Sequence, residues 1–213
     1  MTDTVTLPTN EERQVASDEE SWFQELNELD VASYAAIAAT PTPVLDRVLR
    51  GTTRAADHWK LWLGSAAALA IAGGPRGRRA AVNGIAAMAA SSAVVHLVLK
   101  PLGGRRRPDR TRHQVPVTRQ VSMPTSTSFP SGHAASAAAF VAGVSSAFPE
   151  AGIPLGAAAA LVAYSRVHTG VHYPVDVIVG SVTGTTVAQL VVAALDRGRN
   201  RRTVAPLQAG GRR

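Results

Sequence analysis

Residues 80–99 read AAVNGIAAMAASSAVVHLVL and contain no Asp, Glu, Lys or Arg. A transmembrane helix needs about 20 predominantly apolar residues, so this stretch is long enough to cross a bilayer. A second stretch, residues 177–195, reads VIVGSVTGTTVAQLVVAAL and is also free of charge. Both are rich in small residues, which allow helices to pack closely inside a membrane. These two stretches predict a helical membrane protein.

Three shorter uncharged stretches complete the apolar part of the chain, at residues 61–74, 134–148 and 151–165. Between residues 134 and 195 the only charged side chains are Glu150, Arg166 and Asp176. About a quarter of the residues in a soluble domain are charged, so this region has little to present to water. The sequence therefore predicts an all-α, polytopic membrane helical bundle with about five transmembrane helices, in a core over residues 61–196.

The N-terminal 60 residues have a different character. Residues 1–20 are acidic and aperiodic, which predicts a disordered tail. Residues 21–60 are amphipathic, with Trp22, Phe23 and Leu26 among recurring charges, which favours helices lying on the membrane surface. A sixth span within these 60 residues is the alternative. The chain has no cysteine, which excludes disulfides, thiolate chemistry and cysteine-bound zinc.

The distribution of arginine predicts an orientation. With five spans, the turn at residues 76–79 and the tail at 197–213 lie on one side of the membrane, and loops 100–133 and 166–176 lie on the other. The first side is strongly basic, so the positive-inside tendency makes it cytoplasmic, including the C-terminus. The pI of 10.9 also suggests nucleic-acid binding. However, the basic runs lie between apolar segments with few aromatic residues nearby, which favours membrane lipids as partners and argues against nucleic acid.

Three polar clusters interrupt the apolar background: KPLGGRRRP at 100–108, PSGH at 130–133 and SRVHTGVHYPVD at 165–176. Ionisable groups at membrane depth are costly and usually mark function. Lys and Arg side chains in the first and third clusters can surround a phosphate. In the second cluster, Ser131 and Gly132 at a helix start offer backbone N–H groups to an anion.

The two histidines of these clusters allow a division of labour. One could attack phosphorus while the other protonates the leaving oxygen. Asp176 follows His172 by four residues, so its carboxylate could fix the tautomer of that ring. The sequence has no magnesium-type carboxylate cluster, so positive charge at the transition state would come from Lys and Arg.

Lys-x6-Arg-Pro, Pro-Ser-Gly-His and Ser-Arg-x5-His-x3-Asp, in this order, resemble the three-part signature of the type 2 phosphatidic acid phosphatase superfamily, the lipid phosphate phosphatases. The motifs cover residues 100–176, and the flanking helices extend the resemblance to about residues 60–195. The resemblance implies a phosphohistidine on His172, oriented by Asp176, with His133 as general acid. It implies that five residues bind the phosphate: Lys100, Arg107, Ser131, Gly132 and Arg166. It also implies that no metal or other cofactor is required, and that the site faces outward from a bacterial cell membrane.

Some polar residues have a competing explanation. His168, His172 and Asp176 recur every four residues, as metal ligands on one helix would, but Gly170 and Pro174 interrupt such a helix. The remaining loop arginines could form a rim that attracts anionic headgroups or could be plain solvated loop. They are Arg105, Arg106, Arg110, Arg112 and Arg119.

The function predicted is hydrolysis of a lipid phosphate monoester or diphosphate. The alternatives are a lipid phosphotransferase, a vanadate-dependent haloperoxidase and a non-catalytic lipid-phosphate binder. The candidate lipids are polyprenyl phosphates, diphosphates and phosphosugars, phosphatidate and phosphatidylglycerophosphate. The high Ala, Arg and Gly content is typical of GC-rich bacterial genomes and favours polyprenyl lipids of the cell envelope. Nothing in the sequence indicates an oligomeric state.

Overall fold

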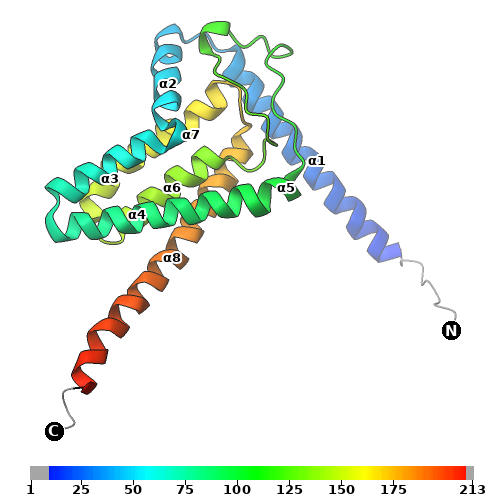
Figure 1. The fold of residues 1–213 in the computed structure, drawn as a ribbon. Coiled ribbons are helices and arrows are strands. Elements are labelled where there is room, and N and C mark those ends of the chain that lie inside the picture. Colours follow the sequence, from blue (N-terminus) through cyan, green and yellow to red (C-terminus); the bar gives the residue numbers. More distant parts are fainter. Residues whose placement is uncertain (1–9, 210–213) are drawn as a thin grey trace.

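The chain folds as a bundle of helices, shown in Figure 1. The computed structural model describes the backbone of residues 10–209 and the side chains of residues 21–201, and every regular element in that range is helical. The main helices are α1 (Asn10–Ala39), α2 (Pro43–Ala56), α3 (Lys60–Ala72), α4 (Gly74–Val94), α6 (Gly132–Ser145), α7 (Pro149–His168) and α8 (Pro174–Ala209). The short pieces are η1 (Asp57–Trp59), η2 (Val95–Leu99), α5 (Lys100–Gly103) and η3 (Val117–Arg119). The predicted all-α class is confirmed.

Helix α6 is the centre of the bundle and packs against α4, α7 and α8. Its sequence, GHAASAAAFVAGVS, contains almost only small residues, and it is buried on several sides. Small side chains let three neighbouring helices approach one backbone closely. Larger residues fill the space toward α3, where Phe140 meets the ring of Trp62 with centroids 5.3 Å apart.

Two glycines of the small-residue stretch in α8, Gly180 and Gly184, lie against α6. A Cβ atom on Gly184 would lie 2.1 Å from the carbonyl oxygen of Ala135, and one on Gly180 would lie 2.5 Å from that of Ser131. Both approaches are far inside van der Waals contact, so only glycine lets α8 cross α6 at this depth. These glycines therefore serve the packing of helices inside the chain.

Among the described residues, two helical runs are long and apolar enough to cross a membrane, Gly74–Gly103 and Pro174–Arg201. They contain the two stretches that the sequence singles out as full-length spans. The other three uncharged stretches correspond to α3, α6 and α7, which pack alongside them. The membrane-type bundle is therefore supported, while five or six complete crossings stay a prediction.

The N-terminal region packs on the bundle through a narrow face. Helix α1 buries Asp30, Tyr34 and Ala38, which recur every four residues, and leaves Trp22 and Phe23 exposed. The helix starts at Asn10, so its first third, residues 10–20, overlaps the segment predicted to be disordered. The rest of that segment, residues 1–9, lies outside the described residues. The break between α1 and α2 falls at the two prolines near residue 42, as their missing N–H groups require.

Ion pairs join the helix ends at the end of the bundle where α4 begins. The residues expected to form a turn, 76–79, lie instead in the first two turns of α4, and the chain reverses at Gly73. Arg79 at the start of α4 pairs with Asp196 of α8 at 2.8 Å, and Arg76 pairs with Glu150 of α7 at 3.2 Å. The basic residues at 76–79 and the start of the basic tail therefore lie together, as the alternation of helices predicts. The polar motifs gather at the other end.

Candidate active site

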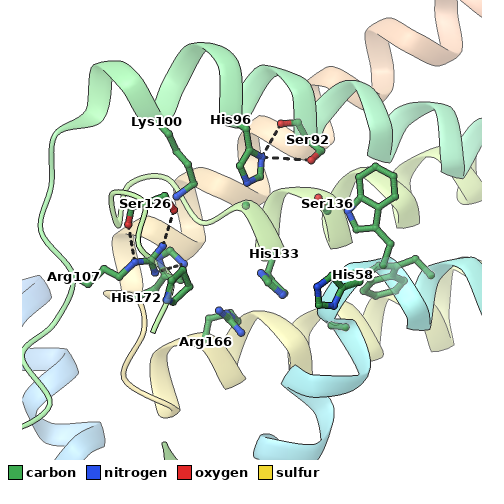
Figure 2. A pocket seen from close by; sticks show the side chains of 15 residues that line it. His58, Ser92, His96, Lys100, Arg107, Ser126, His133, Ser136, Arg166 and His172 are labelled. Atoms are coloured by element: carbon green, nitrogen blue, oxygen red, sulfur yellow. Dashed lines mark hydrogen bonds between the residues drawn. The ribbon is translucent and has the colours of Figure 1, made fainter. Parts of the chain in front are cut away.

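The three sequence motifs converge on one cavity of about 310 Å³. Lys100 reaches it from α5, at the end of the long α4–η2–α5 run, and His133 from the first turn of α6. Arg166 comes from the last turn of α7, while Arg107 and His172 come from loops. Figure 2 shows these side chains pointing toward one another. Of the remaining predicted residues, Gly132 also lines the cavity, while Ser131 and Asp176 are fully buried behind the lining residues.

His172 lies in the loop between α7 and α8, and Asp176 fixes its ring. The imidazole Nδ1 lies 3.4 Å from Asp176 Oδ2, and Nε2 lies 3.2 Å from Nη1 of Arg107. With the Nδ1 proton directed at the carboxylate, the Nε2 lone pair points to the cationic side of the cavity. Burial lowers the pKa of His172 to about 3, and nearby Arg107 and Arg166 act in the same direction. The ring is therefore neutral at neutral pH, which is the form that a histidine nucleophile requires.

The carboxylate of Asp176 is itself held by several donors. It accepts a hydrogen bond from the Ser128 hydroxyl, another from the Tyr173 backbone N–H at 2.9 Å, and an ion pair from Arg105 at 3.0 Å. The same arginine pairs with Asp30 of α1 at 2.7 Å and stacks over the Tyr173 ring at 4.1 Å. Such a network holds the carboxylate in one orientation.

Three cations face the interior of the cavity. Lys100 Nζ donates to the carbonyl of Thr127 at 2.6 Å, and Arg107 Nη1 donates to the carbonyl of Val171 at 2.7 Å. Arg166 is almost fully buried, donates to the Thr53 hydroxyl, and has no partner for Nε among the described residues. Buried donors without protein acceptors are costly, so this guanidinium is ready to receive an anionic oxygen.

The backbone N–H groups at the start of α6 that are available to an anion, here called the anion seat, differ in part from those predicted from the sequence. Ser131 caps the helix, because its hydroxyl accepts from the Ala134 N–H at 3.5 Å, and its own N–H donates to the carbonyl of Asp176 at 2.9 Å. The amide of Ser131 is therefore already occupied. The N–H groups of Gly132 and His133 belong to the first turn and have no intrahelical acceptor, so they are the donors left for a phosphate.

His133 has a partner that the motifs do not predict. Its Nε2 lies 3.0 Å from Asp57 Oδ1, in the kink between α2 and α3. One signal was present in the sequence: Asp57 is one of only six acids after residue 30, in a chain otherwise rich in arginine. Burial lowers the pKa of His133 to about 4 and the charge of Arg166 acts in the same direction, while the Asp57 carboxylate opposes this shift and fixes the ring. A phosphate bound in the cavity would add negative charge beside the ring and so favour the protonated form that a general acid needs.

The histidine and aspartate pattern at residues 168–176 does not form a metal site. Helix α7 ends at His168, which turns to Asp46 of α2 at 2.7 Å. His172 and Asp176 pair with each other instead. Within the described residues there is no group of three or more His, Asp or Glu side chains that could hold a metal ion.

The loop arginines divide into two sets. Arg119 is fully buried, pairs with Asp46 at 2.9 Å and donates to carbonyls at the end of α1, including that of Thr40 at 2.9 Å. Arg105 supports Asp176, and Arg110 donates to the carbonyls of Gly170 and Val121. These three are structural supports rather than a rim. Two stay exposed: Arg106 and Arg112.

The fold and the site together define a helical phosphoryl-transfer enzyme of membrane type. The family model described as the PAP2 superfamily matches residues 81–199, which include all three motifs. The chain belongs to the PAP2 superfamily and is a lipid phosphatase. The family resemblance of the sequence is confirmed.

Relatives with known names support the same class. The decaprenylphosphoryl-5-phosphoribose phosphatase of Mycobacterium tuberculosis is 35% identical over 174 residues, covering 78% of this chain and 92% of that protein. Two crystal structures share the fold. LpxE from Aquifex aeolicus has a TM-score of 0.64 at 23% identity and covers 78% of this chain and 95% of that one. A transmembrane PAP2-type phosphatidylglycerolphosphate phosphatase from Bacillus subtilis has a TM-score of 0.62 at 24% identity, covering 81% and 87%.

Proposed function

We propose that this protein hydrolyses the phosphate monoester of a polyprenyl-linked lipid through a phosphohistidine on His172. The observation that carries the proposal is the pair of imidazoles across one cationic cavity, with His172 held by Asp176 and His133 held by Asp57. A binding protein would need only the cations. Two separately oriented imidazoles are what a nucleophile and a general acid require.

The proposed reaction has two steps. In the first, Nε2 of His172 attacks phosphorus, the bond from phosphorus to the leaving oxygen breaks, and His133 gives its proton to that oxygen. In the second, water attacks phosphorus while His133 takes its proton, the bond from phosphorus to Nε2 of His172 breaks, and inorganic phosphate leaves. Three cations, Lys100, Arg107 and Arg166, with the N–H groups at Gly132 and His133, stabilise the charge on the transferring phosphoryl group.

The choice of a polyprenyl lipid rests on the mycobacterial relative, whose name specifies a decaprenylphosphoryl sugar phosphate. Purified protein should release phosphate from a polyprenylphosphoryl 5-phosphoribose in detergent. We expect lower rates on phosphatidate, phosphatidylglycerophosphate and polyprenyl diphosphate. EDTA should leave the rate unchanged, because the proposed cations are side chains. A preference for phosphatidate would contradict the lipid assignment. Loss of activity in EDTA would contradict metal independence. A phosphorylated acceptor lipid among the products would identify a phosphotransferase.

The proposed setting is the bacterial inner membrane, crossed by the core of residues 61–196, with the site on the extracytoplasmic side and the basic tail of residues 197–213 in the cytoplasm. The two spans supported by length, the position of the site at one end of the bundle and the arginines at the other favour this orientation.

The absence of cysteine permits a direct test. A membrane-impermeant maleimide applied to intact cells should label Arg112→Cys and leave Arg78→Cys unlabelled, and the reverse pattern would invert the proposed topology. Labelling of Thr2→Cys from outside would favour five spans over six.

A further inference from the structure

The active-site cavity has a second end without charged side chains. Figure 2 shows Lys100, Arg107 and His172 at one end, Ser136 and His58 at the other, and His133 between them. The charged side chains of the lining are Lys100, Arg107 and Arg166, none of which belongs to the second end. Three polar residues lie at the second end, His58, Ser92 and Ser136, while His96 lies between this end and Lys100 (Figure 2). The cavity lining also includes the aromatic rings of Trp59, which follows His58 in the sequence, and Trp62, which packs on Phe140. None of these residues is part of the three motifs.

His96 offers a hydrogen-bond acceptor to this end. Its Nδ1 lies 2.9 Å from the carbonyl oxygen of Ser92, which can only accept, so the Nδ1 position carries the proton. In the neutral ring Nε2 is then an acceptor. A Cβ atom on Gly132 would lie 3.4 Å from this nitrogen, so the ring packs directly beside the anion seat. At the border of the phosphate site, this acceptor can receive a hydrogen bond from a hydroxyl on the group to which the phosphate is attached.

The position of His96 is also unusual for a polar side chain. It lies inside the apolar Gly74–Gly103 run, where a polar side chain usually has a functional reason. The surrounding segment, Val95–Leu99, is π-helical, and such turns occur frequently at functional sites. The π-helical turn changes the angular register of the helix at the point where His96 faces the cavity.

The aromatic side of this end is fixed as well. His58 and Trp59 have φ angles of 54° and 62°, the left-handed region that bulky residues rarely adopt. Backbone strain of this kind persists only where the surrounding structure enforces it, and it clusters at functional sites. Trp62 is buried against Phe140, so its ring cannot move away. Rigid indole faces beside hydroxyl partners suit a ring with an apolar C–H face and hydroxyls at its edge.

The reaction itself assigns this end to the leaving group. The leaving oxygen departs on the side of phosphorus opposite the attacking Nε2 of His172, and His133 protonates it there. The space beyond His133 therefore receives whatever that oxygen is attached to. Resting on the proposed function, we infer that this second end is a subsite for a hydroxyl-bearing sugar ring, which lies between the hydrolysed phosphate and the lipid.

A pair of substrates tests the inference. The first is a polyprenylphosphoryl 5-phosphoribose, and the second carries a pentane-1,5-diol spacer in place of ribose, with the same lipid and the same phosphates. His96→Phe removes the acceptor and Ser136→Ala removes a hydroxyl with little change in volume. Each should lower kcat/KM on the ribose substrate about 10- to 100-fold relative to the spacer substrate, the usual effect of leaving a polar partner unpaired. Leu97→Phe adds the same ring on the exposed neighbouring position and serves as the matched control.

The outcomes are distinguishable. Equal loss on both substrates in both variants, or no loss in either, would overturn the subsite, since either result removes any selective contact with the sugar. A wild-type protein that hydrolyses the two substrates equally well would overturn it as well. By contrast, a wild-type protein that releases phosphate from neither substrate would contradict the proposed function before the subsite is reached. Thermal unfolding of each variant identifies any that fail to fold, and the Ser136→Ala result then decides alone.

Discussion

Replacing His172 with alanine is expected to reduce phosphate release by at least about 10⁴-fold, because the variant lacks the proposed nucleophile. The remaining site keeps its cations and still binds the lipid, so KM should change much less than kcat. Phosphate release from the ribose-linked lipid measures the loss. His113→Ala is the matched control, since His113 is an imidazole outside the cavity that packs on the Tyr34 ring at 5.1 Å.

A covalent intermediate gives the same prediction a second readout. Brief incubation with a lipid carrying radioactive phosphate, followed by denaturation in alkali, should leave label on the wild-type chain, because a phosphohistidine survives alkali and is lost in acid. The label should be absent from His172→Ala. Labelling of that variant, or turnover close to that of the wild type, would assign the nucleophile to another residue and remove the basis of the proposed mechanism.

The sequence identifies the residues that line the candidate site, because these polar residues lie next to apolar helices. Charged groups such as Arg166 and Asp176 are conspicuous in a stretch of 62 residues that contains only one other charge. Their spacing along the chain also corresponds to structural boundaries, since α7 ends at His168 and α8 begins at Pro174. A motif that spans the end of one helix and the start of the next necessarily places its residues at the same end of the bundle.

The supporting residues could not be predicted in this way. Asp57 reaches His133 only because His58 and Trp59 adopt left-handed backbone conformations, which no turn-forming residue in the sequence indicates. Ser128 and Arg105 meet at Asp176 from a long connection between α5 and α6 that has little regular structure. Such contacts depend on the tertiary path of a loop, and local periodicity carries no signal for them.

Arg119 is a loop residue whose structural role could not be predicted from the sequence. As one of several loop arginines it could be a solvated charge or part of a headgroup rim. The structure buries it completely, because the last carbonyls of α1 lack intrahelical donors and its guanidinium satisfies them while pairing with Asp46. Its role is decided by the position of a helix end 79 residues away in the sequence.

His133→Ala is expected to lower kcat on the ribose-linked lipid by about 10²- to 10⁴-fold, the usual contribution of a general acid. The leaving group of that lipid is an alkoxide, which departs slowly without a proton. Asp57→Asn should lower the rate in the same direction by a smaller factor, because it removes the negative charge that favours the protonated ring and leaves the imidazole itself in place.

The choice of substrate separates acid catalysis from simple damage to the site. An aryl phosphate such as p-nitrophenyl phosphate has a leaving group that is stable as an anion and needs no proton. His133→Ala should therefore lose far less activity on the aryl phosphate than on the lipid, whereas His172→Ala should lose activity on both, since every substrate needs the nucleophile. An equal loss in His133→Ala on both substrates would mean that this residue positions phosphate rather than protonating the leaving oxygen. The Asp57–His133 pair would then be a binding element, and the leaving group would have to obtain its proton from water.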